Sequence, residues 1–373
     1  MSQATAPTFA VVTGGGTAGH VLPALAIADA LVASGHERGS IHYVGAARGL
    51  EATLLPPTGY PMTLLPGRGI QRKLTVANLR AGGELAAASW RALGLVRRLR
   101  PSVVVAVGGY ASVAVGLAAT MLRVPLLVAE QNQVPGVANR VLARFAKASA
   151  VSFPGTDLPR AVVTGNPIRS DITALDPVRD RRAAKSAFGV DPDRRLVLVF
   201  GGSLGALRLN QAAVAAAARW RDRRDLAVHH VVGRRDWEQL SAAPPSAGGD
   251  LAYRMVPYED DMPRALAAAD VAVCRSGSST CFELAAAALP ALLVPSPHVT
   301  ADQQTGNAEH LVRAGAAVLV RDSDLDGERL AREVDDLLAD DRRLREMAMA
   351  AHRWARPAAA ADIAALAEEV ARG

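Results

Sequence analysis

The chain has 373 residues, half of them hydrophobic, which suffices for two or three domains with substantial cores and excludes a wholly disordered protein. Its two cysteines exclude a disulfide-rich scaffold, and aromatic residues, at 4%, are too few for base-stacking platforms that bind single-stranded nucleic acid. Residues 1–170 hold 16 basic against 6 acidic residues, whereas residues 171–373 are slightly acidic. The basic first half favours an anionic partner: a phosphate group, a membrane surface or nucleic acid.

Four apolar, β-branched runs recur along the chain, each followed by a turn of small residues and then by a helical pattern. These runs are 9–13, 103–107, 196–200 and 271–274. Continuous apolar runs that alternate with helices are typical of parallel strands covered on both faces. The sequence therefore predicts an α/β protein with two doubly wound domains.

The pattern breaks near Gly165, where glycine, proline and a charged stretch follow one another. We expect a first domain over residues 1–167 and a second over residues 168–355. A proline then precedes a last amphipathic pattern, which predicts a terminal helix over 356–373 that packs on the first domain.

Two segments of the first half bear on membrane contact. Residues 103–122 carry no charge and have the length of a membrane span, but glycines near their centre favour a strand followed by a helix. Residues 68–100 hold eight basic residues and one acid, Glu84, with hydrophobic residues between them. This segment is either a patch that docks on an anionic membrane or a surface helix whose leucines face the core.

The first turn has the spacing G-x-G-x-x-G at Gly14, Gly16 and Gly19, which lets backbone N–H groups approach a phosphate. A dinucleotide site also needs an acidic residue at the end of the second strand, and none occurs before Glu51. This absence weakens the interpretation of the chain as an NAD-dependent dehydrogenase. A tight turn without a ligand is the alternative. His20 begins the next helix, whose N terminus should lower the imidazole pKa, so it is either a general base or a capping residue.

The three later turns are also rich in glycine and other small residues. Glycine pairs occupy 108–109 and 201–202, and the fourth turn, 275–280, is rich in hydroxyl groups. Because strand ends of a doubly wound sheet meet at one edge, these turns indicate a nucleotide or phosphate ligand in an interdomain cleft. Glu283 either accepts the hydroxyls of a ribose or favours the helix dipole, and the glutamines at 303–304 suit a sugar.

Residues 322–333 match the spacing of an EF-hand calcium loop, but the segment before them reads as a strand rather than a helix. We therefore expect Asp326 to cap a helix and not to bind a metal. No other segment suggests a metal or cofactor.

The ordered motifs GGGTAGH, GGYAS, EQN, GNPIR, GGSLGALRLN, CRSG and DQQ resemble those of the MurG family over residues 11–316. The resemblance implies a GT-B fold, with two Rossmann-like domains facing across a cleft. It implies an inverting transfer of N-acetylglucosamine from UDP-N-acetylglucosamine to the muramyl 4-hydroxyl of the undecaprenyl-diphosphate-linked pentapeptide (lipid I to lipid II) in peptidoglycan synthesis. It also implies a peripheral protein at the anionic inner membrane surface, on the cytoplasmic face, with no required cofactor and no nucleic-acid partner.

By the same resemblance, the first domain binds the lipid diphosphate and the second binds the nucleotide sugar. His20 is the first candidate for the catalytic base and Glu130 the second. A related enzyme with another lipid or natural-product acceptor is the alternative. The residues expected to contact substrate are Gly16, Thr17, Ala18, Gly19, Tyr110, Asn132, Arg169, Gly202, Ser203, Gly205, Glu259, Ser278, Ser279, Thr280, Glu283, Gln303 and Gln304.

Overall fold

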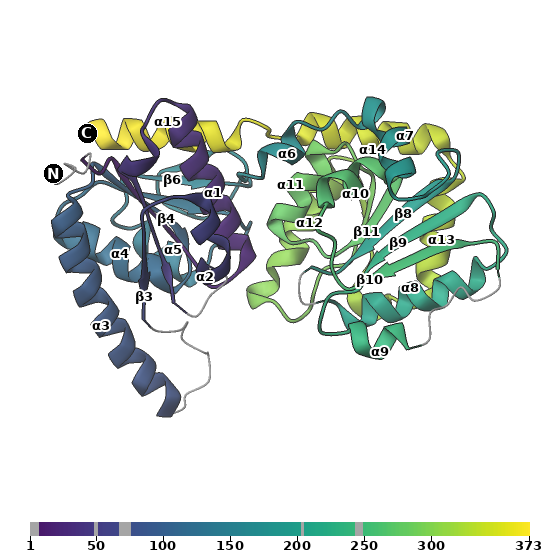
Figure 1. The fold of residues 1–373 in the computed structure, drawn as a ribbon, viewed down its shortest axis with the longest axis horizontal. Coiled ribbons are helices and arrows are strands. Elements are labelled where there is room, and N and C mark those ends of the chain that lie inside the picture. Colours follow the sequence, from purple (N-terminus) through teal and green to yellow (C-terminus); the bar gives the residue numbers. More distant parts are fainter. Residues whose placement is uncertain (1–6, 48–50, 67–75, 203–204, 243–248) are drawn as a thin grey trace. The chain divides into compact units, whose positions relative to one another are not determined.

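The chain folds into two compact units, seen in a computed structural model that describes residues 7–47, 51–66, 76–202, 205–242 and 249–373 (Figure 1). Unit 1 comprises Met1–Arg169 and Arg356–Gly373, and unit 2 comprises Ser170–Ala355. The chain thus passes into unit 2 just after Arg169 and returns to unit 1 for its last residues.

Unit 1 is built on a seven-stranded parallel sheet with the order β3-β2-β1-β4-β5-β6-β7. Its strands are β1 (Ala10–Gly14), β2 (Ile41–Ala46), β3 (Met62–Leu65), β4 (Val103–Gly108), β5 (Leu126–Glu130), β6 (Ala148–Val151) and β7 (Ala161–Val163). Its helices are α1 (Ala18–Ala33), α2 (Glu51–Leu54), α3 (Val76–Leu99), α4 (Tyr110–Met121), α5 (Val137–Leu142), α15 (Ala359–Arg372) and the short η1 (Arg38–Ser40) and η2 (Pro56–Thr58).

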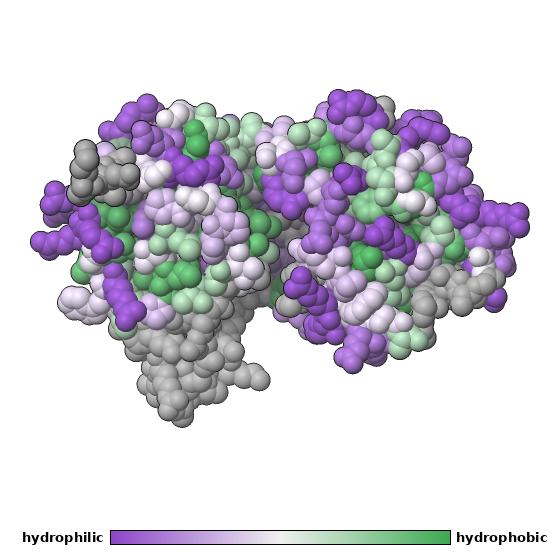
Figure 2. Space-filling model, in the orientation of Figure 1, coloured by the Kyte–Doolittle hydropathy of each residue, from purple (hydrophilic) through white to green (hydrophobic). Residues whose placement is uncertain are grey.

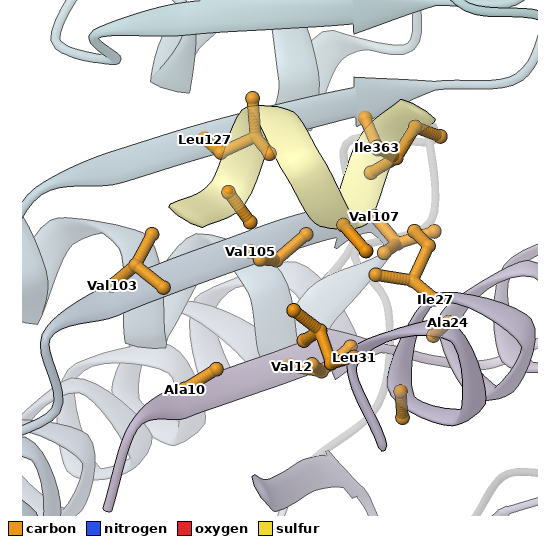
Figure 3. Close-up of a cluster of buried hydrophobic side chains, with 14 of the residues drawn as sticks. Ala10, Val12, Ala24, Ile27, Leu31, Val103, Val105, Val107, Leu127 and Ile363 are labelled. Carbon is orange, nitrogen blue, oxygen red and sulfur yellow. The ribbon is translucent and has the colours of Figure 1, made fainter. Parts of the chain in front are cut away.

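Successive residues of a strand point to opposite faces of the sheet, and here both sets are apolar. Helices therefore cover both faces. Val12 and Val105 face one core, shared with Ile27 of α1 and Ile363 of α15 (Figure 3). Val104 and its alternate neighbours face the other core, shared with α3, α4 and α5. The C-terminal helix is therefore part of the main core of unit 1.

Unit 2 is built on a six-stranded parallel sheet with the order β10-β9-β8-β11-β12-β13. Its strands are β8 (Arg195–Phe200), β9 (Leu226–Val231), β10 (Ala252–Val256), β11 (Val271–Cys274), β12 (Ala291–Leu293) and β13 (Ala317–Leu319). Its helices are α6 (Ser170–Thr173), α7 (Pro177–Ala187), α8 (Leu207–Arg219), α9 (Trp237–Ser241), α10 (Met262–Ala268), α11 (Ser278–Ala286), α12 (Gln303–Arg313), α13 (Gly327–Leu338), α14 (Asp341–Trp354) and the short η3 (Thr300–Asp302) and η4 (Asp322–Asp324).

The second sheet is also covered on both faces. Val197 and Val199 of β8 pack with buried residues of α8 and α13, whereas Leu196 packs with Ala184 of α7 and residues of α10. The predicted pair of doubly wound parallel sheets is therefore confirmed. All four predicted strand–turn–helix units form, as β1–α1, β4–α4, β8–α8 and β11–α11.

The run 103–122 folds as the predicted strand and helix, β4 and α4. No helix in the described ranges has both the length and the apolar composition that crossing a membrane requires. The segment that resembles an EF-hand loop follows strand β13, and the Asp326 side chain accepts a hydrogen bond from the Arg329 N–H at 2.7 Å. Asp326 is thus the helix cap that the sequence predicts.

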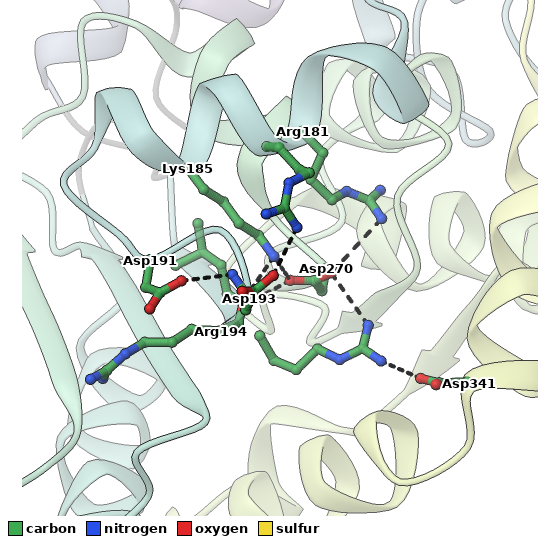
Figure 4. A network of polar contacts seen from close by, with 10 residues as sticks. Arg181, Lys185, Asp191, Asp193, Arg194, Asp270 and Asp341 are labelled. Atoms are coloured by element: carbon green, nitrogen blue, oxygen red, sulfur yellow. Dashed lines mark hydrogen bonds and ion pairs between the residues drawn. The ribbon is translucent and has the colours of Figure 1, made fainter.

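A buried ion pair connects α7 to the sheet of unit 2 (Figure 4). The Lys185 ammonium lies 2.7 Å from Asp270, and both side chains are 5% exposed. Asp270 also accepts the N–H of Leu196 at 2.8 Å, and the guanidinium groups of Arg181 and Arg195 lie within 3.8 Å and 3.6 Å. The carboxylate is therefore the centre of a network that positions α7 against β8.

We expect Asp270→Ala to lower the free energy of unfolding by about 3–5 kcal/mol, because it leaves the buried Lys185 charge without its partner. Equilibrium unfolding in urea measures this change. Asp193→Ala is the control, since it breaks the exposed pair between Asp193 and Arg182 and should cost less than about 1 kcal/mol. Equal losses in the two variants would contradict a central role for Asp270.

Candidate functional site

Each sheet reverses its strand order once, between β1 and β4 in unit 1 and between β8 and β11 in unit 2. In open α/β sheets, ligands bind beyond the carboxyl ends of the strands at such a switch point. The four turns that the sequence singles out follow these four strands. The fold therefore brings them together in two pairs, one pair in each unit.

In unit 1 the paired turns touch through their backbones. The Gly15 N–H donates to the Gly108 carbonyl oxygen at 3.2 Å. A Cβ atom on Gly109, whose φ is 86°, would lie 2.3 Å from the Gly15 carbonyl oxygen. Only glycine permits this approach and this backbone conformation. The GGYAS motif is thus explained by its contact with the first glycine loop.

The helices that follow the four turns begin without a capping side chain. This holds for α1 after Thr17, α4 after Gly109, α8 after Ala206 and α11 after Gly277. The first N–H groups of a helix lack partners within the helix, and the helix dipole favours an anion beside them. Both switch points therefore present donors suited to a phosphate group.

His20 lies in the first turn of α1 and is partly buried. Its Nδ1 is 3.2 Å from the Gly15 carbonyl oxygen and 3.3 Å from the Thr17 hydroxyl. Because a carbonyl oxygen only accepts, Nδ1 carries the hydrogen, and the lone pair of the neutral ring is on Nε2. Burial lowers the pKa of His20 from its ordinary value of 6.5, against opposing effects of Glu130, the Gly15 hydrogen bond and Glu51.

A neutral imidazole with a free lone pair is what a general base requires. The pKa of His20 moves in the direction that the sequence predicts, but the main cause is burial and not the helix dipole. Burial depends on the tertiary packing around the ring, which a local motif does not describe.

Glu130 ends β5 and is 3% exposed. Its Oε1 accepts the N–H of Asn132 at 2.9 Å, and its Oε2 accepts the N–H of Gly136 at 3.0 Å and the side-chain amide of Asn139 at 2.9 Å. The carboxylate thus shapes the turn after β5. A base role for Glu130 stays a prediction. Sequence reasoning missed Asn139, whose only signal in the sequence is its position in α5 just after this turn.

The Gly16 N–H is already bonded, because it donates to Glu51 Oε1 at 2.9 Å. The N–H groups of Thr17, Ala18 and Gly19 have no such partner among the described residues. A substrate anion would therefore meet the latter donors rather than the N–H of Gly16. Because Glu51 already accepts the Gly16 N–H, this N–H is not available to a dinucleotide diphosphate, which disfavours an NAD site.

The other expected residues of unit 1 lie around the same edge of the sheet or at its end. Tyr110 is the first residue of α4, and its hydroxyl donates to the Pro66 carbonyl oxygen at 3.3 Å. Asn132 belongs to the turn organised by Glu130, and Arg169 is the last residue before the chain enters unit 2.

In unit 2 the turn after β8 needs glycine at two positions. Gly202 and Gly205 have φ values of 90° and 82°, and a Cβ atom on Gly205 would lie 2.5 Å from the Val232 carbonyl oxygen. Ser203 lies outside the described residues. The turn therefore approaches β9 through its backbone, as expected for a loop that holds a diphosphate.

The turn after β11 is joined to α12, so two separate predicted segments meet. The Ser276 hydroxyl donates to the Gln304 carbonyl oxygen at 2.8 Å, and the Gln304 side-chain oxygen accepts the Ser296 N–H at 2.8 Å. Gln304 thus has a structural contact besides any role with a sugar. The neighbouring predicted residues are Ser278, Ser279, Thr280 and Glu283 in α11 and Gln303 at the start of α12.

Glu259 follows β10 and pairs with a buried histidine that sequence reasoning missed. Its Oε2 lies 2.8 Å from His229 Nε2, and its Oε1 accepts the Asp261 N–H at 2.9 Å. The next residue of β9, His230, lies 3.0 Å from the Asn210 side-chain oxygen. Burial lowers the pKa of His230 to about 4, so its ring is neutral near pH 7. The only sequence signal was the histidine pair in an apolar strand.

Within the described ranges, no three histidine, cysteine or acidic side chains come together in a way that would hold a metal ion. The residues of the segment that resembles an EF-hand have other partners: Asp322 pairs with Arg275 at 2.6 Å, and Glu333 pairs with Arg329 at 2.7 Å. This segment therefore has a structural role in unit 2.

Comparison with known proteins agrees with this geometry. Residues 10–151 match the Glycosyltransferase family 28 N-terminal domain, and residues 196–366 match the Glycosyltransferase family 28 C-terminal domain. These two matches, together with two parallel-sheet units, define a glycosyltransferase.

Individual relatives identify the family within this class of glycosyltransferases. The UDP-N-acetylglucosamine--N-acetylmuramyl-(pentapeptide) pyrophosphoryl-undecaprenol N-acetylglucosamine transferase of Alkalilimnicola ehrlichii is 42% identical over 97% of this chain and 99% of its own length. A protein of the same name from Burkholderia ambifaria is 41% identical over 97% of this chain and 96% of its own. The crystal structure of Acinetobacter baumannii MurG aligns with a TM-score of 0.78 and 29% identity, over 97% of this chain and all of that one. The chain belongs to this transferase family, the MurG family.

The protonation state of His20 is open to measurement. We expect its imidazole to titrate below pH 6.5 in the folded protein, because burial disfavours the charged ring. A pH titration followed by NMR on ring-labelled histidine measures this, with His20→Gln to assign the signal. A His20 signal that titrates above pH 6.5 would contradict the neutral base.

Proposed function

We propose that this protein transfers N-acetylglucosamine from UDP-N-acetylglucosamine to undecaprenyl-linked N-acetylmuramyl pentapeptide, the reaction for which its relatives are named. The observation that carries the proposal is the pair of switch-point sites, each with glycine turns and helix N termini without capping side chains. The reaction has two substrates that each contain a diphosphate, and such a group suits each site. The identity to the transferases over nearly the whole chain supports the same reaction.

In this proposal unit 2 holds the donor. Gly202 and Gly205, with Ser203, contact the UDP diphosphate, and the hydroxyl groups at the start of α11 line the nucleotide. Glu283 accepts hydrogen bonds from the ribose hydroxyls, a task that suits a carboxylate one turn inside that helix. The side-chain amides of Gln303 and Gln304 bind the hydroxyl groups of the sugar. Glu259, through its pair with His229, positions the end of β10 near the base.

Unit 1 then holds the acceptor. The N–H groups of Thr17, Ala18 and Gly19 lie at the positive end of the α1 dipole, where the lipid diphosphate would bind. Tyr110, at the start of α4, borders the same switch point. Asn132 follows β5 at the same edge of the sheet, and Arg169 is the last residue before the chain enters unit 2. Both reach the donor in this assignment.

The proposed mechanism is a single displacement with inversion. The muramyl 4-hydroxyl oxygen attacks the anomeric carbon, the bond from that carbon to the UDP oxygen breaks, and Nε2 of His20 takes the hydroxyl proton. The Gly15 carbonyl, by holding Nδ1–H, keeps the lone pair on Nε2. Backbone N–H groups of the turn after β8 stabilise the charge on the departing UDP, so the mechanism calls on no metal.

We further infer that the protein works at the membrane surface, on its cytoplasmic face. Most large hydrophobic side chains that the described part exposes belong to unit 1: Met62, Trp90, Met121, Val137, Val141, Phe145, Val162 and Val163. Trp90 of α3 is 76% exposed and is followed in the same helix by the exposed Arg91 and Arg97. In Figure 2, hydrophobic residues lie at the surface of unit 1 among hydrophilic ones, whereas the visible face of unit 2 is mostly hydrophilic. Aromatic and basic residues together suit an anionic bilayer.

Incubation of the purified protein with radiolabelled UDP-N-acetylglucosamine and a lipid I analogue tests the reaction. We expect label in the lipid product, and His20→Ala should reduce kcat at least about 100-fold, the usual contribution of a general base. Hydrolysis of the donor without transfer, or transfer only to another acceptor, would refute the reaction. Unchanged turnover in His20→Ala would refute the assigned base.

Glu283→Gln tests the donor assignment. The variant should raise KM for UDP-N-acetylglucosamine by about 10-fold or more, because a hydrogen bond to a charged group is worth about 1.5–3 kcal/mol. The KM for the lipid should stay the same. Glu328→Gln, at an exposed position of α13 in the same unit, is the control. An unaltered donor KM in Glu283→Gln would remove Glu283 from the ribose site.

A further inference from the structure

Glu51 is a buried carboxylate that the mechanism above does not use. It is the first residue of α2 and is 0% exposed. Its Oε1 accepts the N–H of Gly16 at 2.9 Å and the N–H of Ala46 at 3.0 Å. Gly16 lies in the loop after β1 and Ala46 ends β2, so one oxygen connects the loop to the neighbouring strand.

The backbone around this carboxylate leaves room for it at two glycines. A Cβ atom on Gly15 would lie 2.1 Å from Glu51 Oε1, and one on Gly45 would lie 2.8 Å from its Cγ. Both distances are shorter than any normal contact of a Cβ atom, so a side chain at either position would displace Glu51. The carboxylate therefore occupies a slot that these two glycines create.

Other groups hold the rest of the loop, and Glu51 holds the N–H of Gly16. The Tyr43 hydroxyl donates to the Gly14 carbonyl oxygen at 2.8 Å, and the Gly15 carbonyl oxygen faces His20 Nδ1. Gly16 is exposed and has a φ of 90°, so its peptide could turn outward if nothing held it. In the described residues, the contact with Glu51 is what holds its N–H inward.

We propose that Glu51 is a positioning residue for the transfer reaction. By holding the Gly16 N–H from inside, it fixes the loop so that the N–H groups of residues 17–19 and Nε2 of His20 keep the arrangement that receives the acceptor. This inference rests on the proposed function. The negative charge of Glu51 also raises the pKa of His20, against the effect of burial, so the residue acts on the imidazole through space as well as through the loop.

Three substitutions separate these effects. Glu51→Ala removes both hydrogen bonds, and we expect kcat to fall about 100-fold, as for loss of a correctly placed base, with the KM for UDP-N-acetylglucosamine within about threefold of wild type. Glu51→Gln keeps an oxygen that accepts both N–H groups, so kcat should stay within about fivefold. Glu37→Ala, at an exposed position of the same unit, should behave as wild type.

The pH dependence of kcat supplies a readout that a merely structural role would not move. Loss of the negative charge in Glu51→Gln lowers the pKa of His20 further, so the ring stays neutral to lower pH and the acid limb of the profile should move to lower pH than in wild type. In Glu51→Ala, hydrogen exchange of the Gly16 amide should become faster, and this measurement does not depend on turnover.

The outcomes are distinct. Wild-type kcat and Gly16 exchange in Glu51→Ala would overturn the inference, as would an acid limb that does not move in Glu51→Gln. If Glu51→Ala does not fold, the rate and pH profile of Glu51→Gln decide. If the wild-type protein transfers no sugar to a lipid I analogue, the proposed function fails, whereas the exchange of Gly16 still tests the contact.

Discussion

One backbone oxygen, the carbonyl of Gly15, sets the arrangement on which the chemistry proposed for unit 1 depends. It lies so close to Gly109 that a side chain there has no room, and it also faces Nδ1 of His20. The approach of the two turns and the tautomer of the imidazole therefore have a common origin. A substitution that shifts this oxygen would change the spacing of the turns and the direction of the His20 lone pair together.

The two units prepare their switch points with different chemistry. In unit 1, which is rich in basic residues, the turns are shaped from inside by the carboxylates of Glu51 and Glu130, each of which accepts backbone N–H groups. These anions engage the inward donors and leave outward donors for a ligand. In unit 2 the turn after β11 is held by the neutral contact of Ser276 with Gln304 and by the ion pair of Arg275 with Asp322. A buried anion beside an anion site costs affinity, because like charges repel.

Much of the fold was predictable, because a parallel strand buried on both faces is a continuous apolar run and each turn at a switch point has glycine or small residues. The positions of the four turns and the cap at Asp326 followed from local patterns. The lowered pKa of His20 was expected from the helix dipole, but it arises mainly from burial. The bond from Gly16 to Glu51 and the pair of His229 with Glu259 did not, because each joins residues 35 or 30 positions apart. Such contacts depend on which strands are neighbours, and strand order is a property of the whole sheet.

The return of the chain to unit 1 has a consequence for biosynthesis. Ile363 and Ala367 of α15 belong to the same core as β1 and β4, yet they leave the ribosome after all of unit 2. The first unit to begin synthesis is therefore the last to complete its core, and one face of its sheet stays partly uncovered while unit 2 is made. Since exposed apolar strands favour aggregation, the nascent chain is most in need of chaperones during this interval.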